Sequence, residues 1–399
     1  MDKTIEAKHW RHDLPLEDLR IAVSRAELDA RRDKVLAGMA AERIDALVLT
    51  TPLSIYYLTG IGLGGLPPLA FALAASGAHR FMLRLIDLKW RDVWADQTWA
   101  TEWLAFRDED DTDEVIGRAI REIHPRGISR LGMELNRPSA SYQTVRRVTE
   151  LSGALDVVSA THLVEDQRVV KSEAEQAIIR RAGLLANRAT DTIIATIAAG
   201  GTDVEAAMAA AALTVKEGHG GHPPHYPYVF AGPSGETGHL PWARVAPKPG
   251  EVVTWFVKGF IHKYGCPIER TLIKGPDTQK VGAMIESVAR TVERVAAALR
   301  PGMTSDEAYR VAYRSHEEAG FAKYFPNHAA YSFGLHSAEF ELFRLRANDT
   351  RVLRAGMTFH LVPCLIVPGI GNICASRPVV VTESGGAPLN DYPLRLAVV

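Results

Sequence analysis

A chain of 399 residues is long enough for about two domains. Its composition, 47% hydrophobic and 23% charged, is typical of a globular protein and excludes disordered, collagen-like and disulfide-scaffold classes. The net charge of -1 excludes the basic surplus that binds nucleic-acid phosphates. No segment approaches the ~18 consecutive apolar residues of a membrane span, and the chain starts without the apolar core of a secretory signal. We therefore expect no nucleic-acid or membrane partner and a cytoplasmic location, which three scattered cysteines without a disulfide framework also favour.

Helix and strand patterns alternate in the first 166 residues. Ser24 and Glu27 form a capping box that starts a helix. A buried strand over 45–51 follows, and Ser76 to His79 indicate a hairpin turn between two further strands. The remaining elements are two helices, over 113–124 and 141–151. This order predicts an α/β domain with a mixed sheet, and the charged run 165–168 predicts a linker after it.

The second part, residues 167–399, repeats an order of two helices followed by strands. Capping boxes at Ser172 and Thr202 start the first two helices. The other predicted elements are strands over 226–274, helices over 278–299 and 305–319, and strands over 357–383. The pattern predicts an α+β domain with helices on one face of a curved antiparallel sheet.

Histidines and one glutamate are the first candidates for chemistry. His219, His222 and His225 are spaced by three, but glycine and proline surround them and no carboxylate or cysteine is near, so we favour a structured loop over a metal site. His239 ends a Gly- and Pro-rich loop, where it suits proton transfer or lies on the surface. Glu269 interrupts an apolar strand, either to contact a ligand or to pair with its neighbour Arg270.

Several short sequence motifs occur in the same order as in a known superfamily. They are Arg168–Glu175, Pro249–Val253, Arg270–Thr271, Arg300–Thr304 and Ala355–Phe359. On these phrases the chain resembles the creatinase/prolidase/methionine aminopeptidase superfamily of pita-bread folds. The resemblance implies a creatinase-like N-terminal domain over 1–166 and a pita-bread catalytic domain over 167–399. It also implies a homodimer in which the N-terminal domain of one subunit completes the active site of the other.

The peptidases of this superfamily bind two metal ions through two Asp, one His and two Glu, and the matching positions here differ. They hold Phe256, Pro267, Tyr331, Val362 and, for the last Glu, one of Ala375, Ser376 and Arg377. Hard cations need several oxygen or nitrogen donors, which this set lacks. We therefore expect no metal and no cofactor.

Other phrases resemble members of the superfamily that work without metal. Glu269–Leu272 and His239 match creatinase, whereas Gly356–Pro363 and Ala330–Gly334 match ectoine hydrolase. The resemblance implies metal-independent hydrolysis of a C–N bond in a small-molecule substrate, either a cationic amidine or guanidino compound or a cyclic zwitterion. Glu269 would face the cation, as an orienting or a covalent group, and His239 would carry protons.

The remaining candidate residues would hold the substrate. Tyr331, His360 and Phe256 are expected to line the site, although the first two also suit a hydrogen-bonded core. Further candidates are Glu339 and Glu341 as cation contacts or as a solvated face, and Arg84 with Asp87, as a carboxylate-binding arginine or an ion pair.

Two other classes of function stay open at this stage. The absence of the last metal-binding Glu of the peptidases favours a pita-bread protein that binds a partner without catalysis. Such a protein, however, needs neither His239 nor Glu269. A lyase acting on a small zwitterion is the third possibility, with one of these two residues abstracting a proton.

Overall fold

The computed structural model describes residues 20–62, 70–218, 226–232, 235, 240–277, 281–326, 328–336, 339 and 342–399. The chain divides into two compact units, one ending at Arg168 and the other beginning at Val169. Each unit has its own hydrophobic core. In the described part of the chain, no helix is both long and apolar enough to span a bilayer.

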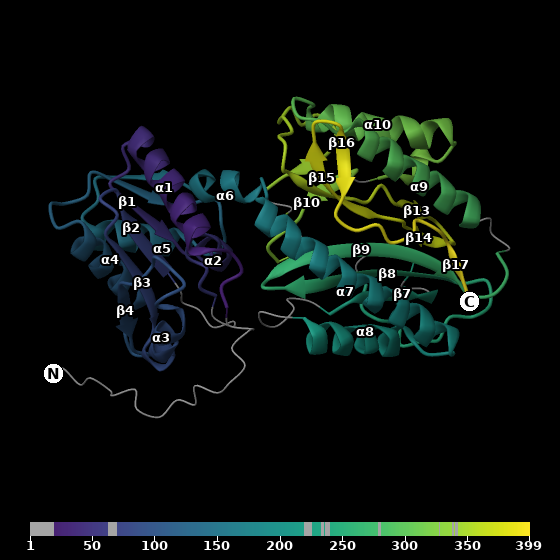
Figure 1. The fold of residues 1–399 in the computed structure, drawn as a ribbon, viewed down its shortest axis with the longest axis horizontal. Helices are drawn as coiled ribbons and strands as arrows, with labels where there is room; N and C mark the ends of the chain where they lie inside the picture. The colour runs from purple at the N-terminus through teal and green to yellow at the C-terminus, as the bar shows by residue number, and fades with distance from the viewer. Residues whose placement is uncertain are drawn as a thin grey trace. The chain divides into compact units, whose positions relative to one another are not determined.

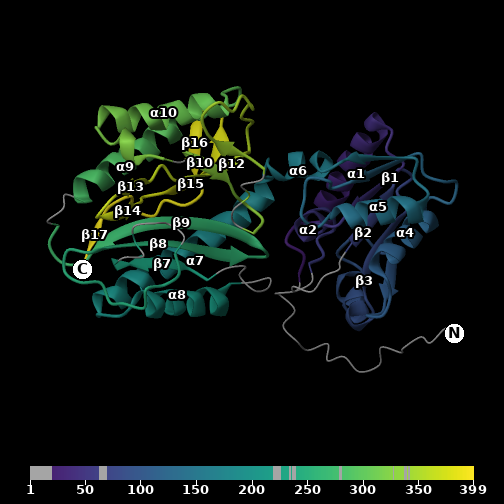
Figure 2. The ribbon, with the colours of Figure 1, turned by 180° about the vertical axis from the view of Figure 1, so that it is seen from behind.

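The first unit is a twisted mixed sheet between two layers of helices (Figures 1 and 2). Its strands, in the spatial order β4-β3-β2-β1-β5-β6, are β1 (Ala46–Leu49), β2 (Ala70–Ala74), β3 (His79–Arg84), β4 (Trp103–Phe106), β5 (Arg130–Met133) and β6 (Asp156–Ser159). Its helices are α1 (Arg25–Glu42), α2 (Pro52–Thr59), η2 (Leu85–Trp90), α3 (Arg91–Trp94), α4 (Thr112–Ile123), α5 (Tyr142–Ser152) and α6 (His162–Arg168). The pairs β1–β2 and β2–β3 are antiparallel and the other three are parallel, which confirms the predicted mixed sheet.

The predicted linker at 165–168 is wrong, because these residues complete α6. Asp166 is exposed, but the other two charges of the run are not: Glu165 accepts two hydrogen bonds from Arg137, and the Arg168 side chain is buried. Leu163 and Val164 bury the apolar side of the same helix. A charged run indicates a linker when all its charges face water, and here Glu165 and Arg168 turn inward from a helix.

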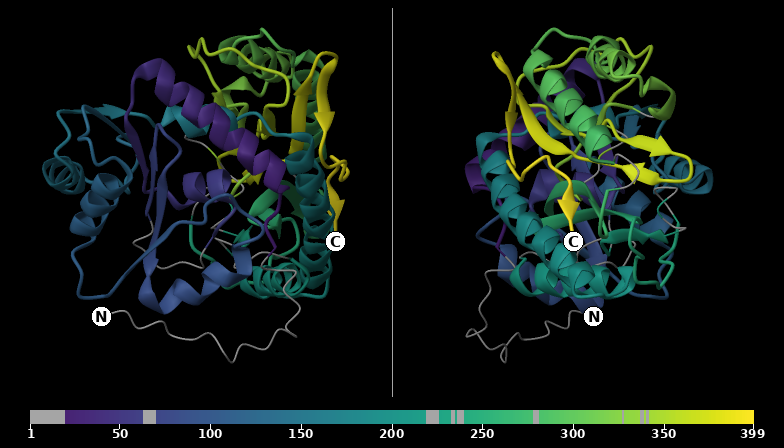
Figure 3. Two further views of the ribbon diagram at one scale, coloured as in Figure 1. Left: turned by 60° about the vertical axis from the view of Figure 1, so that its left-hand side comes forward. Right: turned by 90° about the vertical axis from the view of Figure 1, so that its right-hand side faces the viewer.

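The described residues of the second unit form two helix pairs and three sheets, whose strands are antiparallel except for one edge strand (Figure 3). Its helices are α7 (Glu173–Ala198), α8 (Asp203–Glu217), α9 (Val281–Ala298), α10 (Ser305–Glu318) and η4 (Ala322–Tyr324). One sheet has the order β17-β9-β8-β7, with β7 (Tyr228–Ala231), β8 (Val252–Ile261), β9 (Tyr264–Ile273) and a parallel edge strand β17 (Ala397–Val398). The second has the order β11-β10-β12-β15-β16, with β10 (Ala330–Ser332), β11 (Arg344–Leu345), β12 (Thr358–Leu361), β15 (Arg377–Thr382) and β16 (Gly385–Pro388). The third is the hairpin of β13 (Leu365–Val367) and β14 (Gly371–Ile373).

The predicted α+β pita-bread unit is confirmed, and its helices start where the capping boxes place them. The hydroxyls of Ser172 and Thr202 accept hydrogen bonds from the backbone N–H groups of Glu175 and Glu205, and both glutamates return the bond. A bridge between Arg270 and Ala375 connects β9 to the segment before β15, so the two larger sheets meet along one line.

Close packing of α7 on β8 depends on Gly259. A Cβ atom there would lie 1.9 Å from the backbone oxygen of Ala182, well inside van der Waals contact. We expect Gly259→Ala to lower the free energy of unfolding by about 1–3 kcal/mol, because the helix has to move off the strand. Gly282→Ala is the control, since its Cβ meets only the Asp277 carboxylate, at 3.2 Å, and alanine favours helix α9. Urea unfolding of both variants tests this, and equal midpoints would contradict it.

Candidate functional site

The hairpin of β8 and β9 places the candidate residues on one face. Its turn, His262–Lys263, has positive φ at both positions, as a two-residue type I′ turn requires. The register sets Phe256 opposite Glu269 and Lys258 opposite Pro267. Because side chains alternate across a strand, these four share the face turned away from the core under α7, which contains Trp255, Val257, Ile268 and Leu272.

The Glu269 carboxyl lies in a crowded setting that disfavours its charge. Its Oε1 atom accepts a hydrogen bond from Asn372 Nδ2 at 3.3 Å and lies 3.2 Å from Cys374 Sγ. Desolvation raises the pKa of Glu269 to about 7, although the Asn372 hydrogen bond and the Arg270 charge oppose the shift. At neutral pH the carboxyl therefore exists in both protonation states.

The local ion pair considered for Glu269 and Arg270 does not form. Alternation sends Arg270 to the opposite face of β9, where its guanidinium donates to the backbone oxygens of Pro393, Tyr392 and Ser376. Glu269 is therefore not neutralised by its neighbour in sequence.

A hydrogen-bonded chain of three side chains lies beside Glu269. The backbone N–H of Glu269 donates to Ser376 Oγ at 2.8 Å, and Ser376 Oγ lies 2.6 Å from His360 Nε2. His360 Nδ1 lies 2.7 Å from the Tyr331 hydroxyl. Burial, followed by the charges of Arg270 and Lys258, holds the pKa of His360 well below its usual value, so the ring is neutral.

One arrangement of hydrogen atoms satisfies all the hydrogen bonds among Ser376, His360 and Tyr331. Ser376 donates its hydroxyl hydrogen to Nε2, and the neutral ring then donates Nδ1–H to Tyr331. The Tyr331 O–H remains a donor, because burial and the nearby Glu269 charge raise its pKa well above the usual value. These hydrogen bonds thus hold the protonated phenol of Tyr331 beside the titratable carboxyl of Glu269.

Phe256 completes this group, which we call the Glu269 cluster: Phe256, Lys258, Glu269, Tyr331, His360 and Ser376. The ring centroid of Phe256 lies 5.8 Å from that of His360 and 6.2 Å from that of Tyr228. Lys258 Nζ lies 4.6 Å from the centroid of the Phe256 ring. Of the sequence candidates, the structure therefore brings together Glu269, Tyr331, His360 and Phe256.

The other candidates lie elsewhere or outside the described residues. Glu339 is buried and binds Lys171 at 2.6 Å, so it has an internal cation as its partner. In the first unit, Arg84 pairs with Asp108 at 2.7 Å rather than with Asp87, which lies in η2. The candidates outside the described residues are His219, His222, His225, His239 and Glu341.

Sequence reasoning missed Lys258, Asn372 and the role of Ser376. Lys258 had a signal, since it is the lone charge within an apolar strand. Ser376 and Asn372 had none, because they meet Glu269 through pairings between segments about a hundred residues apart.

The cysteines also differ from expectation, because Cys364 and Cys374 form a disulfide across the β13–β14 hairpin. They follow the register of Leu365 opposite Ile373, with Cα atoms 4.7 Å apart. Glu269 and the two cysteines offer possible metal-ligand atoms within 4.8 Å of one another. Both sulfurs are bonded to each other in the disulfide, so within this group only the Glu269 carboxylate can serve as a metal ligand.

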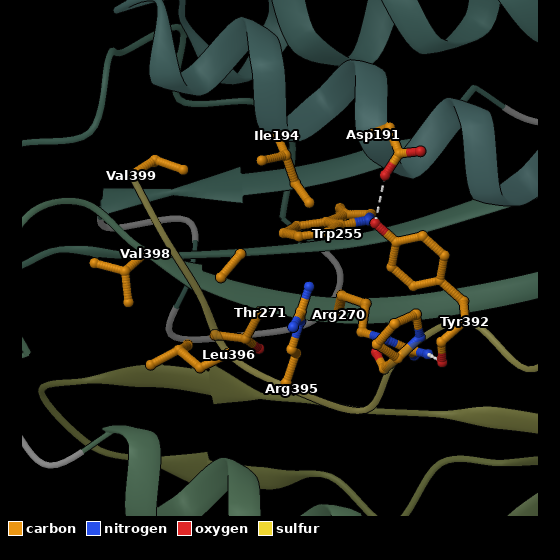
Figure 4. Close-up of a pocket in the computed structure, with 12 residues that line it drawn as sticks. Asp191, Ile194, Trp255, Arg270, Thr271, Tyr392, Arg395, Leu396, Val398 and Val399 are labelled. Carbon is orange, nitrogen blue, oxygen red and sulfur yellow. Dashed lines mark hydrogen bonds between the residues drawn. The ribbon is translucent and has the colours of Figure 1, made fainter.

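A separate cavity of about 650 Å³ lies on the opposite face of the β8–β9 sheet (Figure 4). It lies between α7 and the C-terminal segment, where the Tyr392 hydroxyl donates to Asp191 at 2.6 Å. Trp255 and Arg270 line it, and alternation along β8 and β9 places both on the face opposite Glu269. This cavity therefore contains none of the candidate chemistry.

Comparison with known proteins identifies the family. Residues 177–383 match the model of metallopeptidase family M24, and residues 31–170 match the creatinase/prolidase N-terminal domain. The chain belongs to metallopeptidase family M24.

Its relatives extend over nearly the whole chain. The chain is 24% identical to an Xaa-Pro dipeptidase of Pyrococcus furiosus over 89% of its own length and 96% of that protein's. It is 27% identical to the probable dipeptidase PepE of Mycobacterium tuberculosis, over 94% and 97%. The solved Xaa-Pro dipeptidase from Bacillus anthracis superposes with a TM-score of 0.81 at 20% identity, over 93% of this chain and 100% of that one.

These comparisons overturn part of the expectation from sequence. The superfamily is confirmed, but these relatives are named dipeptidases, which cleave peptide bonds, and the family model is that of a metallopeptidase. A metal-independent hydrolase of non-peptide C–N bonds, similar to ectoine hydrolase or creatinase, is therefore wrong.

The residues at the positions matched to metal ligands do not fit a pair of hard cations. Phe256 stacks on the Tyr228 ring, and Pro267 and Val362 carry no donor atom in their side chains. Tyr331 and Ser376 have hydroxyls, and both are engaged with His360. We derive no step through a metal at these positions.

Proposed function

We propose that this protein hydrolyses the peptide bond of small peptides, with the Xaa-Pro dipeptides as the first class to test. The Glu269 cluster carries the proposal: a titratable carboxyl beside a fixed phenol donor, in a chain whose relatives are named dipeptidases. The expected homodimer stays a prediction.

Hydrolysis of an amide needs a base for water, an acid for the leaving nitrogen and a donor for the carbonyl oxygen. With a pKa of about 7, Glu269 can take a proton from water as the oxygen attacks the carbonyl carbon. The same carboxyl then returns this proton to the nitrogen as the C–N bond breaks. Tyr331 donates its hydroxyl hydrogen to the carbonyl oxygen, and His360 holds the phenol in position.

A substrate panel tests this proposal. The purified full chain is incubated with Xaa-Pro and Xaa-Ala dipeptides, with a chelator in one arm and added divalent metal in another, and free amino acids are measured by chromatography. We expect both amino acids to appear in equal amounts in at least one arm. A Glu269→Gln preparation purified in parallel reports contaminating peptidases from the host. Absence of release above that background in every arm would overturn the proposal.

A further inference from the structure

Lys258 is a buried cation without a counter-charge in the described part of the chain. Its side chain is nine-tenths buried in the middle of β8. Among the described residues, no carboxylate and no hydrogen-bond acceptor contacts its ammonium, whose contact is the face of the Phe256 ring, 4.6 Å from the centroid. Burial lowers the pKa of Lys258 to about 8.

A charged side chain at this buried position lowers the stability of the folded state, which favours a functional role for the ammonium. Most of the side chain is removed from water, which disfavours the charged form of the ammonium. Methionine or leucine would fill the same strand position without this penalty. A largely buried cation on the same face of the hairpin as the Glu269 carboxyl is therefore a candidate receptor for an anion.

The register sets the distance between Lys258 and Glu269. Phe256 lies directly opposite Glu269, and Lys258 is the next residue on the same face, so the two are diagonal neighbours. Such neighbours are ~7–8 Å apart at the backbone. Lys258 is also close enough to His360 for its charge to act on the imidazole.

We propose that Lys258 binds the C-terminal carboxylate of the peptide whose scissile bond lies at Glu269. The assignment rests on the proposed function and specifies its substrate class, a peptide with a free carboxylate one residue beyond the cleaved bond. One residue spans ~3.3–3.6 Å, and a hydrogen bond of ~3 Å at each end brings the total to ~9–10 Å. Two side chains that extend from backbones ~7–8 Å apart can bracket a span of that length. A tripeptide cleaved at its first bond would place its carboxylate one residue too far.

Binding of a product-like ligand tests the assignment without turnover. L-proline and L-prolinamide are titrated calorimetrically into the full chain, and we expect proline to bind about tenfold or more tightly, because a hydrogen bond to a charged group discriminates by that much. Lys258→Met should abolish the difference. Lys248→Met, which removes an exposed lysine, should retain it.

The two proposals fail separately. Equal affinity of the native chain for proline and prolinamide, or unchanged discrimination in a folded Lys258→Met variant, would overturn the role of Lys258 even if dipeptides are cleaved. Discrimination that depends on Lys258 without cleavage of any dipeptide would overturn the proposed hydrolysis and leave the carboxylate site in place. Where turnover occurs, Lys258→Met should raise KM for dipeptides about tenfold and leave kcat nearly unchanged, because it removes binding in the ground state.

Discussion

Replacing Lys171 by methionine is expected to lower the free energy of unfolding by about 3–5 kcal/mol. Lys171 Nζ and Glu339 Oε2 are 2.6 Å apart, and each side chain is only 1% exposed. Methionine fills most of the volume of lysine but leaves the Glu339 carboxylate buried without its cation. Urea unfolding, followed by circular dichroism, measures the loss.

Two controls identify the unpaired charge as the cause. The double variant Lys171→Met/Glu339→Leu should recover most of the loss, since apolar replacement of a whole buried pair is often neutral. Arg294→Met breaks an exposed pair with Glu318 and should cost less than about 1 kcal/mol. A single Lys171 variant as stable as the native chain would show that this pair is not important for stability.

Glu269→Gln is expected to lower kcat for dipeptides by about 10²–10⁴-fold, because glutamine keeps the shape of the side chain but transfers no proton. The measurement is the initial rate on the best dipeptide of the panel. Glu317→Gln, which changes an exposed glutamate on α10, should match the native rate. A Glu269→Gln rate within threefold of the native one would contradict the role of this carboxyl.

The same variant should change how stability depends on pH. The pKa of Glu269 rises from 4.5 to about 7 on folding, so between these values the native state retains a proton that the unfolded state has lost. Native stability should therefore fall by about 3 kcal/mol as the pH rises from 4.5 to 7, since each pKa unit corresponds to ~1.4 kcal/mol. Glu269→Gln lacks this contribution and should gain stability relative to the native chain over that window. Parallel curves for the two proteins would show that the pKa of this carboxyl is not raised.

The helix starts, the two-domain order and the family could be predicted from sequence because each depends on local patterns. The capping boxes at Ser172 and Thr202 form within four residues, and the phrases around Arg270 and Gly356 keep their order along the chain. The reaction could not be predicted, since the resemblance to metal-independent hydrolases depended on short phrases that the comparisons did not support.

Local alternation along β9 places Glu269 and Arg270 on opposite faces, and a reading of the sequence can find this without knowing the fold. The partners of Glu269 belong to tertiary structure alone, because Ser376, Asn372 and Tyr331 reach it from strands and loops distant in the chain. Pairing of β8 with β9 likewise places Lys258 diagonally from Glu269 on one face, and among the described residues no carboxylate contacts its ammonium. Desolvation and long-range contacts set the chemistry of such groups, and neither is encoded in the spacing of neighbouring residues.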